Sequence, residues 1–451
     1  MRYTPFAKEI NDVDPSELKS LREVHEGWYV EYKSQLVKPR SLAKSLASFA
    51  NQFGGWLFLG IDENKHTGTA GTFPGISNEE LPQVLESLRN AAKDIIRPVV
   101  EYRERIFPGP IESIGIDSNH SLLVIYVPEG PNTPYVHNDG KICIRIGDSS
   151  SPDHARDRAT FDLLFRRGED KRQLLKLQTD RTPRLSDIEG EHSHLHLSIQ
   201  SDPYATLGHR YTASFSEFSE MMKEGFLPFD NVYATLDGFV ARQVKRNDRI
   251  LRLFTWEFSR DGHSFVTVPM TRLSCSSSEW TSGTVGQDGL LSRGETAKEF
   301  CEIVSRYGLS DCPVLDLTQF ADLVLAIFRR HRTIMSQTDK SGPLHIKARI
   351  ENVWRTIPFI DLPEYIEHVE KYDIPLVQWN KFEWPPAWSM NPCVTIPEWD
   401  SVPKEPEPGS DQGPILIWLR MMESLGIPGE FLVKNAEKLW KTSRQRRKEG
   451  L

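Results

Sequence analysis

The chain lacks several features that would place it in a special class of protein. None of its 451 residues belongs to an uninterrupted apolar run of about 18, the length that a membrane-spanning helix needs. Its first 14 residues are polar and acidic, unlike the basic start and apolar stretch of a secretory signal. Internal repeats and low-complexity segments are also missing. We therefore expect a cytoplasmic protein with no membrane partner.

Cysteine is scarce and scattered. The chain holds five cysteines, an odd number, and none of them form a C-x-x-C pair. This usage predicts neither a disulfide framework nor a zinc ribbon, and small buried thiols are the simplest interpretation. The five are Cys143, Cys275, Cys301, Cys312 and Cys393.

An excess of basic charge is missing as well. The formal net charge is −8, which by itself argues against a nucleic-acid partner. Residues 1–168 hold 20 Lys plus Arg against 23 Asp plus Glu, a net charge of −3. A bound cation would cancel the charge of any of these acids that serve as metal ligands, so composition leaves the question open.

Length and patterning predict two domains with extra segments, in the α+β class. We expect an N-terminal mixed α/β domain, followed by a connector and a β-rich second domain with C-terminal helices. The boundaries read from the sequence are 1–168 for the first domain, 169–192 for the connector, 193–382 for the second domain, 383–411 for a loop or linker containing Pro and Trp, and 412–451 for the helices and a basic tail.

Helix and strand patterns alternate through the first domain. A helix is expected near 15–24, a strand in WYVEYK (28–33), a helix over 40–51 and a buried strand in WLFLGID (56–62). Later segments predict helices at 78–95 and 155–166, the second ended by Gly168, and strands near VVEYRERI, ESIGID, SLLVIYVP and KICIRIG.

The second region mixes strand-like stretches with helix-like ones. Strands are expected in HLHLSIQ, NVYATLDGFVARQV, ILRLFTWEF, SFVTVPM and LHIKARIENVW, with helices near 296–308, 317–333, 413–425 and 428–443. No catalytic motif is evident here. The tryptophans at 379, 384, 388 and 399 suit either base stacking or the anchoring of a long segment to the domain beneath it.

Three acids in the first domain draw attention as a candidate metal site. Glu31 lies in the strand WYVEYK, Glu26 comes just before that strand, and Asp62 ends WLFLGID. If the two strands are neighbours in a sheet, their ends can bring the three carboxylates together. Such hard oxygen ligands suit Mg²⁺ or Mn²⁺, which can activate water for attack on a phosphodiester.

Lys33 lies two residues after Glu31, and so on the same face of one strand. A lysine in this place can orient water or counter charge in the transition state. The tripeptide E-x-K is common, however, and a solvated surface charge is the ordinary interpretation of any one of these residues alone.

The ordered motifs around these acids resemble the Schlafen AlbA-like domain family. The family pattern is a glutamate, a second glutamate five positions on inside E-[FY]-K, a helix ending in A-F-A-N-x-x-G-G, and an apolar strand ending in G-[VI]-x-[DE]. This chain matches with Glu26, Glu31-Tyr32-Lys33, Ser48-Phe49-Ala50-Asn51, Gly54-Gly55 and Gly60-Ile61-Asp62, with Ser48 in place of the first alanine. Pro134–His137 and ICIRIGDSSSPDHA resemble a later family segment.

The resemblance covers residues 15–168 and implies a domain that handles nucleic acid. Some members of the family cut tRNA or rRNA with two glutamates and an aspartate, which fall here on Glu26, Glu31 and Asp62. It implies a metal-dependent endoribonuclease acting on structured, tRNA-like RNA. Since animal relatives clamp RNA with two such domains and this chain shows one, we expect a homodimer. A role in antiphage defence would fit a bacterial origin. The glycines do not form the G-x-x-x-x-G-K-[ST] pattern of a P-loop.

Basic and hydroxyl side chains near the acids are candidates for binding nucleic acid. Several basic residues follow Lys33 in the sequence. Separately, a strand arginine followed by a serine-rich turn can bind backbone phosphate. A solvent-facing basic fringe explains them equally well. These residues are Lys38, Arg40, Lys44, Arg145 and Ser149.

Two other functions remain open from the sequence. The first is a non-catalytic nucleic-acid-binding or regulatory module that dimerises through the N-terminal domain. The second makes the region after residue 193 the effector, with the N-terminal domain serving only as a platform for dimerisation.

Overall fold

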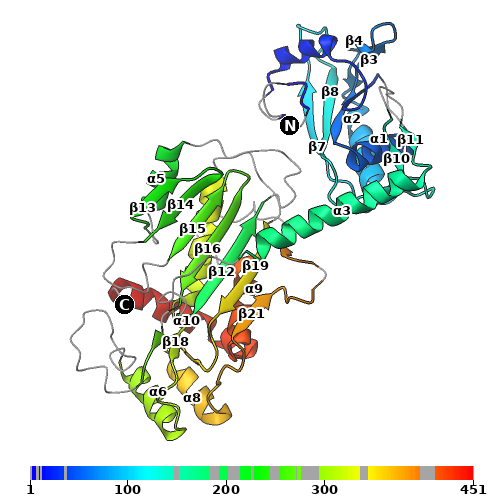
Figure 1. The fold of residues 1–451 in the computed structure, drawn as a ribbon. Helices are drawn as coiled ribbons and strands as arrows, with labels where there is room; N and C mark the ends of the chain where they lie inside the picture. Colours follow the sequence, from blue (N-terminus) through cyan, green and yellow to red (C-terminus); the bar gives the residue numbers. More distant parts are fainter. Residues whose placement is uncertain are drawn as a thin grey trace. The chain divides into compact units, whose positions relative to one another are not determined.

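The structure is a computed structural model in which the chain divides into two compact units. One unit is formed by Met1–Lys176, and the other begins at Leu177. The residues described are 3–6, 10, 13–34, 38–146, 152–181, 192–201, 214–224, 228–243, 254–270, 272–275, 294–335, 344–389, 391–396 and 412–449. Helices and several sheets occur in both units, which confirms the α+β class (Figure 1).

The N-terminal unit is built on a five-stranded sheet with the order β1-β2-β8-β5, in which β7 also pairs with β8. The first two strands are parallel and joined through helix α1, and β8 runs antiparallel to β2, β5 and β7. These elements are β1 (Val30–Lys33), α1 (Pro39–Asn51), β2 (Gly55–Leu59), β5 (Ile76–Ser77), β7 (Arg103–Pro108) and β8 (His120–Val127).

Strand β2 is buried at every position, as its apolar sequence predicts. Leu57 and Leu59 face the core beneath α1 and the helix α2 (Leu81–Asn90), which continues as the π-helical turn η3 (Ala91–Ile95). Trp56 and Phe58 face a second core on the opposite side of the sheet. The 3₁₀ helix η2 (Pro15–Glu23) contributes Leu18 and Leu21 to that second core.

Short two-stranded ribbons complete the unit. One ribbon pairs two strands that follow β2, and the others pair strands from more distant parts of the unit. Of the later strand predictions, ESIGID (112–117) is not confirmed, because only its Ile116 forms an isolated bridge, with Ile111 just before the segment. The ribbon strands are β3 (Asp62–Asn64) with β4 (Thr69–Thr72), β6 (Ile96–Arg97) with β9 (Val136–His137), and β10 (Cys143–Ile144) with β11 (Asp153–His154).

Helix α3 (Arg158–Thr179) corrects the prediction that Gly168 ends a helix at this point. The helix continues through Gly168, which is buried against the segment before β9. A Cβ atom built on Gly168 would lie 2.7 Å from the carbonyl oxygen of Thr133. The hydroxyl of Thr133 also donates to the carbonyl of Leu164, 2.7 Å away. Gly168 therefore serves close packing of the helix on this segment and not helix termination.

The C-terminal unit contains an eight-stranded sheet with the order β13-β14-β15-β16-β12-β19-β21, with β22 also paired to β19. All of its neighbouring strands are antiparallel. The stretch expected to be a loop or linker supplies β22 and part of β21. The strands are β12 (His194–Gln200), β13 (Asn231–Ala234), β14 (Gly238–Arg242), β15 (Thr255–Ser259), β16 (His263–Pro269), β19 (Leu344–Glu351), β21 (Lys381–Trp384) and β22 (Val394–Ile396).

Helices pack on one face of this sheet, where alternate residues such as Leu195, Leu197 and Ile199 enter a large apolar core. A smaller sheet, with the order β17-β18-β20, contributes to the same core. The remaining elements of the unit are α5 (Phe215–Lys223), α6 (Glu295–Arg306), α7 (Phe320–Met335), α8 (Pro363–Tyr372), α9 (Gln412–Ser424), α10 (Gly429–Glu449), β17 (Arg272–Leu273), β18 (Val314–Asp316) and β20 (Ile357–Phe359).

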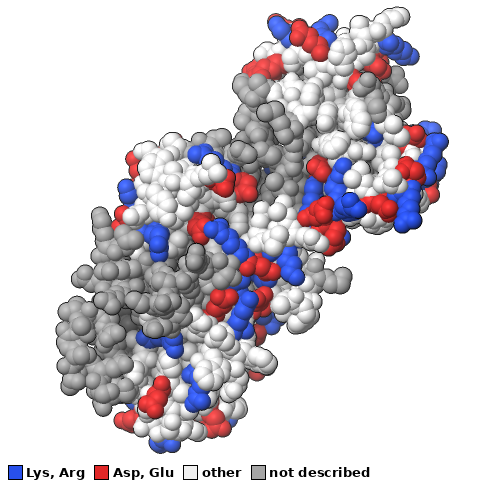
Figure 2. All heavy atoms as spheres, in the orientation of Figure 1, with Lys and Arg blue, Asp and Glu red and all other residues white. Residues whose placement is uncertain are grey.

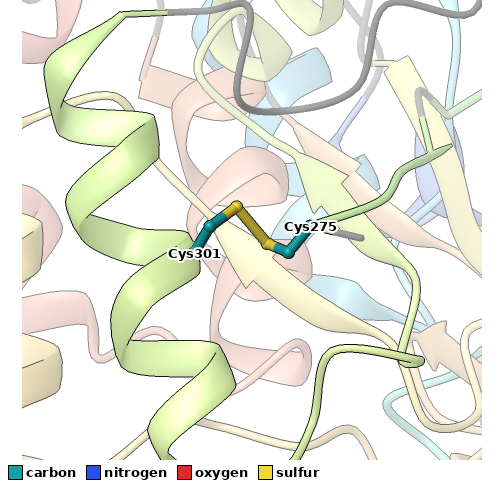
Figure 3. The surroundings of a disulfide bond; sticks show 2 residues. All are labelled: Cys275 and Cys301. Atoms are coloured by element: carbon teal, nitrogen blue, oxygen red, sulfur yellow. A yellow bond between two sulfur atoms is a disulfide. The ribbon is translucent and has the colours of Figure 1, made fainter. Parts of the chain in front are cut away.

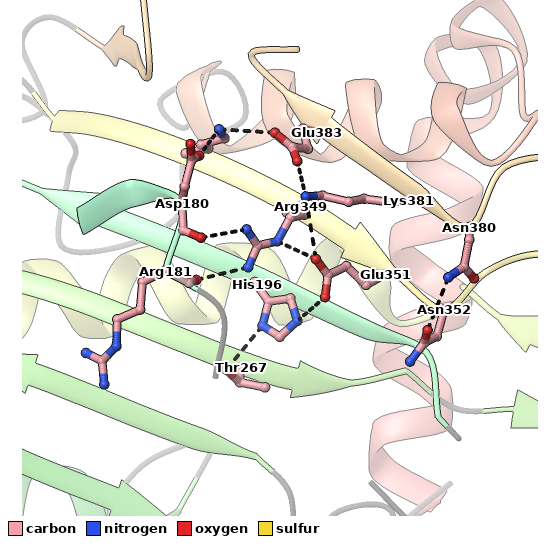
Figure 4. Close-up of polar contacts among 11 residues, drawn as sticks. Asp180, Arg181, His196, Thr267, Arg349, Glu351, Asn352, Asn380, Lys381 and Glu383 are labelled. Carbon is pink, nitrogen blue, oxygen red and sulfur yellow. Dashed lines mark hydrogen bonds and ion pairs between the residues drawn. The ribbon is translucent and has the colours of Figure 1, made fainter. Parts of the chain in front are cut away.

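The other face of the large sheet carries polar side chains, although many of them are buried. Figure 4 shows His196 of β12 between Thr267 of β16 and Glu351 of β19. The guanidinium of Arg349 contacts Glu351 at 2.9 Å and donates to the carbonyl of Arg181 at 3.0 Å. Charges on this face are thus neutralised by neighbours on adjoining strands, as buried ions require.

Cys275 and Cys301 form a disulfide, contrary to the expectation of unpaired thiols (Figure 3). Cys275 lies just after β17, and Cys301 lies on the buried face of α6. Their Cα atoms are 5.2 Å apart, although 26 positions separate them in the sequence. Tertiary packing brings them together, and no local spacing reveals it. Cys143, Cys312 and Cys393 are free and buried.

Within the described ranges, none of the helices combines the length and the apolar composition that crossing a bilayer requires.

We expect Gly168→Ala to destabilise the N-terminal unit. Alanine ordinarily stabilises a helix interior by up to about 1 kcal/mol relative to glycine. Here the new methyl group would press on the backbone of Thr133, so the effect should reverse sign. Thermal unfolding of the full chain measures it, with Asp170→Ala on the exposed side of α3 as the matched control. A Gly168→Ala protein as stable as that control would contradict the packing role.

We also expect the C-terminal unit to lose stability in mild acid through His263. Burial lowers the pKa of this histidine to about 4, and its Nε2 atom lies 2.9 Å from the hydroxyl of Ser198. The unfolded chain takes up a proton near pH 6.5 whereas the folded chain resists until about pH 4. Stability should therefore fall as the pH drops through this window, by about 3 kcal/mol in total for this group.

The His263→Gln variant should flatten the pH dependence of the unfolding midpoint between pH 6.5 and 4. Wild-type and variant proteins with the same slope would show that His263 does not cause the loss.

Candidate nucleic-acid site

The candidate site lies on the β1-α1-β2 segment of the N-terminal unit. Strands β1 and β2 are parallel neighbours, with Lys33 opposite Leu59, so their carboxyl ends meet at one edge of the sheet. Helix α1 connects the two strands and therefore begins at this same edge. Ligands of open α/β sheets bind at such edges, beside helix N-termini and strand ends.

Glu31 is buried in the middle of β1, with 1% of its surface exposed. Its Oε1 atom accepts a hydrogen bond from Ser45 of α1 at 2.8 Å and lies 2.9 Å from the ammonium of Lys33. The contact between Glu31 and Lys33 confirms that these two residues share one face of the strand. Lys33 itself remains about one-third exposed.

Arg145 occupies the other oxygen of Glu31. Its two terminal nitrogens lie 3.0 and 3.3 Å from Oε2, and its Nε atom donates to the carbonyl of Gly27 at 3.3 Å. The guanidinium also lies 4.2 Å from the centre of the Phe49 ring. The side chain has no exposed surface, so it holds Glu31 instead of facing solvent, where a phosphate would approach. This differs from the phosphate contact expected from the sequence.

Burial lowers the pKa of Arg145, whereas the negative charges of Glu31 and Glu26 act in the opposite direction. The two acids therefore compensate a cation that has been removed from water.

Glu26 is half-buried and precedes β1, and its backbone N–H bonds to the carbonyl of Gly68 at 2.7 Å. Its carboxylate accepts a hydrogen bond from the backbone N–H of Tyr32. Burial raises the pKa of the Tyr32 hydroxyl, and Tyr3 and Glu26 add to that effect. That hydroxyl donates to the carbonyl of Val24 at 3.0 Å. Through its hydrogen bond with the N–H of Tyr32, Glu26 binds the main chain directly after Glu31.

Asp62 is exposed and does not end the buried strand, which corrects the sequence-based placement. Strand β2 stops at Leu59 because Gly60 turns the chain with a φ of 96°, in the region that favours glycine. Asp62 instead begins β3, where it is paired with Thr72. The backbone N–H groups of Gly60 and Ile61 still bond to the carbonyl of Lys33, which keeps this turn at the edge where β1 ends.

The three acids do not fit a divalent ion in the arrangement described. Both oxygens of Glu31 are engaged by Ser45, Lys33 and Arg145. Over the part of the chain that the structure describes, no three His, Cys, Asp or Glu residues come together as metal ligands would. The structure thus does not bring Glu26, Glu31 and Asp62 together as a metal site.

Basic residues gather at the start of α1. Lys38 and Arg40 are exposed and Lys44 is half-buried, while the first turn of the helix has no acidic residue. The partial positive charge of the helix N-terminus adds to these cations. On the face drawn in Figure 2, by contrast, acidic and basic residues are interspersed. This end of α1 can attract an anion such as backbone phosphate. Ser149 lies outside the described residues.

The C-terminus of α1 is held by Asn51, which was expected to bond to backbone, and by Arg167 of α3. Asn51 is fully buried and donates to the carbonyls of Tyr135 and Cys143, at 2.8 and 2.9 Å, while its own oxygen accepts from the N–H of Tyr135. Arg167 of α3 donates to the carbonyls of Asn51 and Gln52 at 3.0 Å. The signal for Asn51 was its place in the A-F-A-N motif, since a buried amide must find partners.

The comparisons with known proteins concern the N-terminal unit. Residues 26–153 match the family model described as Schlafen, AlbA_2, which confirms the resemblance found in the motifs. The match indicates a nucleic-acid-related function. No curated protein matches the chain.

Two solved structures are similar to parts of the chain. One is the N-terminal domain of an ATP-dependent DNA helicase RecG-related protein from Nitrosomonas europaea, at 21% identity over 32% of this chain and 96% of that chain, with a TM-score of 0.23. The other is the DIP2311 protein from Corynebacterium diphtheriae, at 15% identity over 35% of this chain and 25% of that chain, with a TM-score of 0.19. These scores are too low to support a functional argument.

We expect Arg145→Met to destabilise the N-terminal unit by about 3–5 kcal/mol, because it leaves Glu31 buried without its main counter-ion. Glu31→Gln should cost a similar amount, and the double variant should cost less than the sum of the two. Urea unfolding measures these changes, and hydrogen exchange of the β1 amides assigns them to this unit.

Arg158→Met is the matched control, because Arg158 and Asp162 form an ion pair on the exposed side of α3. Such pairs contribute about 0–1 kcal/mol. If Arg145→Met costs no more than this control, the buried pair does not hold the fold together.

Proposed function

We propose that the N-terminal unit is an endoribonuclease core that acts on structured, tRNA-like RNA. The observation that carries this proposal is the edge formed by the ends of β1 and β2 and the start of α1. Lys33, Lys38 and Arg40 supply positive charge there, and the turn that leads to Asp62 lies at the same edge. The Schlafen AlbA_2 match over residues 26–153 supports nucleic acid as the ligand.

Lysine and arginine at this edge would neutralise backbone phosphates, which supplies most of the affinity for RNA without reading its sequence. Lys44 is placed to extend the contact along α1. Glu31 is not free to act as a general base, because Ser45, Lys33 and Arg145 already occupy both of its carboxylate oxygens. Asp62, by contrast, is exposed at the edge and accessible to a substrate.

Mg²⁺ or Mn²⁺ bound by Glu26, Glu31 and Asp62 stays a prediction. Because the described arrangement does not group these acids, the proposal assigns the ion no catalytic step. A homodimer that forms the full RNA groove, and a role in antiviral defence, are proposed on the family resemblance alone.

A non-catalytic nucleic-acid-binding or regulatory module is the second candidate. The full pairing of Glu31 favours it, because a carboxylate held by two cations is typical of a structural ion pair.

The test is cleavage of total tRNA by the full chain with Mg²⁺, with Mn²⁺ and with EDTA. We expect the wild type to cut tRNA and Asp62→Asn to lose at least about tenfold in rate while still binding tRNA, as for loss of one catalytic group. Glu63→Gln, at the next position of β3, is the matched control and should cut normally.

If the wild type binds tRNA but cuts no RNA or DNA with either ion, the binding module replaces the nuclease. Cleavage that persists in EDTA would remove the metal from the proposal.

A further inference from the structure

Two tryptophans on adjoining loops of the C-terminal unit are largely exposed. Trp354 follows β19 with 57% of its surface exposed, and Trp379 precedes β21 with 71% exposed. Indole rings normally find a buried place, because each carries a large apolar area. By contrast, Trp384 of β21 is half-buried and packs against the core, so it anchors its segment. The sequence left stacking and anchoring open for the tryptophans at 379, 384, 388 and 399. Of these, Trp388 is also exposed, and Trp399 lies outside the described residues.

The two loops that carry Trp354 and Trp379 are bonded to each other along their backbones. Arg355 donates to the carbonyl of Val377 at 2.8 Å, and Val377 donates to the carbonyl of Thr356 at 3.0 Å. The N–H of Trp354 bonds to the side chain of Asn380 at 3.4 Å. Hydrogen bonds between the two loops therefore hold the backbone that carries both exposed rings.

The backbone on either side of Trp354 adopts an uncommon conformation. Asn352 and Arg355 have φ values of 60° and 56°, in the left-handed region that side chains other than glycine rarely occupy. Such conformations persist where the surrounding contacts enforce them, and they cluster at binding sites. The amide of Asn352 contributes to this enforcement, since it contacts the amide of Asn380, as Figure 4 shows.

Arg355 adds a positive charge to the same surface. Its guanidinium lies 5.5 Å from the centre of the Trp354 ring, within cation–π range. No carboxylate in the described part of the chain pairs with it, unlike Lys381 nearby, which contacts Glu351 and Glu383. The surface thus combines two aromatic rings, side-chain amides and an available cation.

We propose that Trp354, Arg355 and Trp379 form a stacking platform for the bases of single-stranded RNA. Flat rings accept any base by stacking, and an adjacent arginine neutralises the backbone phosphate. Paired bases are enclosed in a duplex, so single-stranded loops or ends are the form that such a platform can bind. The choice of nucleic acid over protein rests on the proposed function of the N-terminal unit and on the charge of Arg355.

The experiment measures binding of a fluorescein-labelled oligouridylate to the full chain by anisotropy. We expect Trp354→Ala and Trp379→Ala each to weaken binding by roughly 5- to 100-fold, the range found for loss of one base–aromatic contact. Trp354→Phe should restore most of the affinity. Tyr233→Ala on β13, at the opposite end of the strand order, is the matched control, because Tyr233 is an aromatic residue with 45% exposure.

Arg355→Gln should act differently from the tryptophan variants. Loss of one phosphate contact lowers the slope of log affinity against log salt by about 0.7 for a single strand. The tryptophan variants should weaken binding with little change in that slope, since stacking is not a charge interaction.

Anisotropy that is equal in the wild type, Trp354→Ala and Trp379→Ala would overturn the platform. If the tryptophan variants instead change the oligomeric mass measured by sedimentation and leave RNA binding unchanged, the surface contacts a second copy of the chain. Failure of the platform can be distinguished from failure of the proposed nuclease. The nuclease is tested by the rate of tRNA cleavage by the wild type and by Asp62→Asn. A chain that binds oligouridylate through the tryptophans and cuts nothing would keep the platform and lose the nuclease.

Discussion

The edge of the sheet that carries the candidate site depends on the buried ion pair between Glu31 and Arg145. An unpaired charge in this position would be costly, so each residue requires the other. The pair joins β1 to the segment that follows β10, and it involves α1 through Ser45 and Phe49. A single carboxylate thereby fixes three separate parts of the chain around one edge of the sheet. The basic start of α1 is positioned as a consequence of this arrangement.

Much of the N-terminal unit could be predicted because local pattern and tertiary packing agree there. Most of the apolar run WLFLGID becomes a strand buried on both faces, and the helix expected over 40–51 forms as α1, with Leu42 and Leu46 on its buried side. The match of residues 26–153 to a Schlafen, AlbA_2 model agrees with the resemblance that the motifs indicated. Prediction from the sequence succeeds where the local structural preference of each residue agrees with its place in the fold.

The errors come from residues whose neighbours are distant in the chain. Arg145 was expected to bind phosphate because a serine-rich turn follows its strand, yet its partner Glu31 lies 114 positions away. Asp62 was placed at a strand end because the turn at Gly60 could not be recognised within an apolar run. Glycine often ends a helix, so Gly168 was expected to do so. Only the short distance between a Cβ atom built on Gly168 and the Thr133 carbonyl oxygen shows that this glycine permits close packing. The arrangement of the candidate site was therefore less predictable than its location.

The disulfide between Cys275 and Cys301 has a consequence for how this protein can vary. It fastens the end of β17 to α6, so both ends of the intervening segment have fixed positions. The entropy of closing a loop grows only with the logarithm of its length. A change in the number of residues between these cysteines would therefore alter the entropy of closing this covalent ring only slightly.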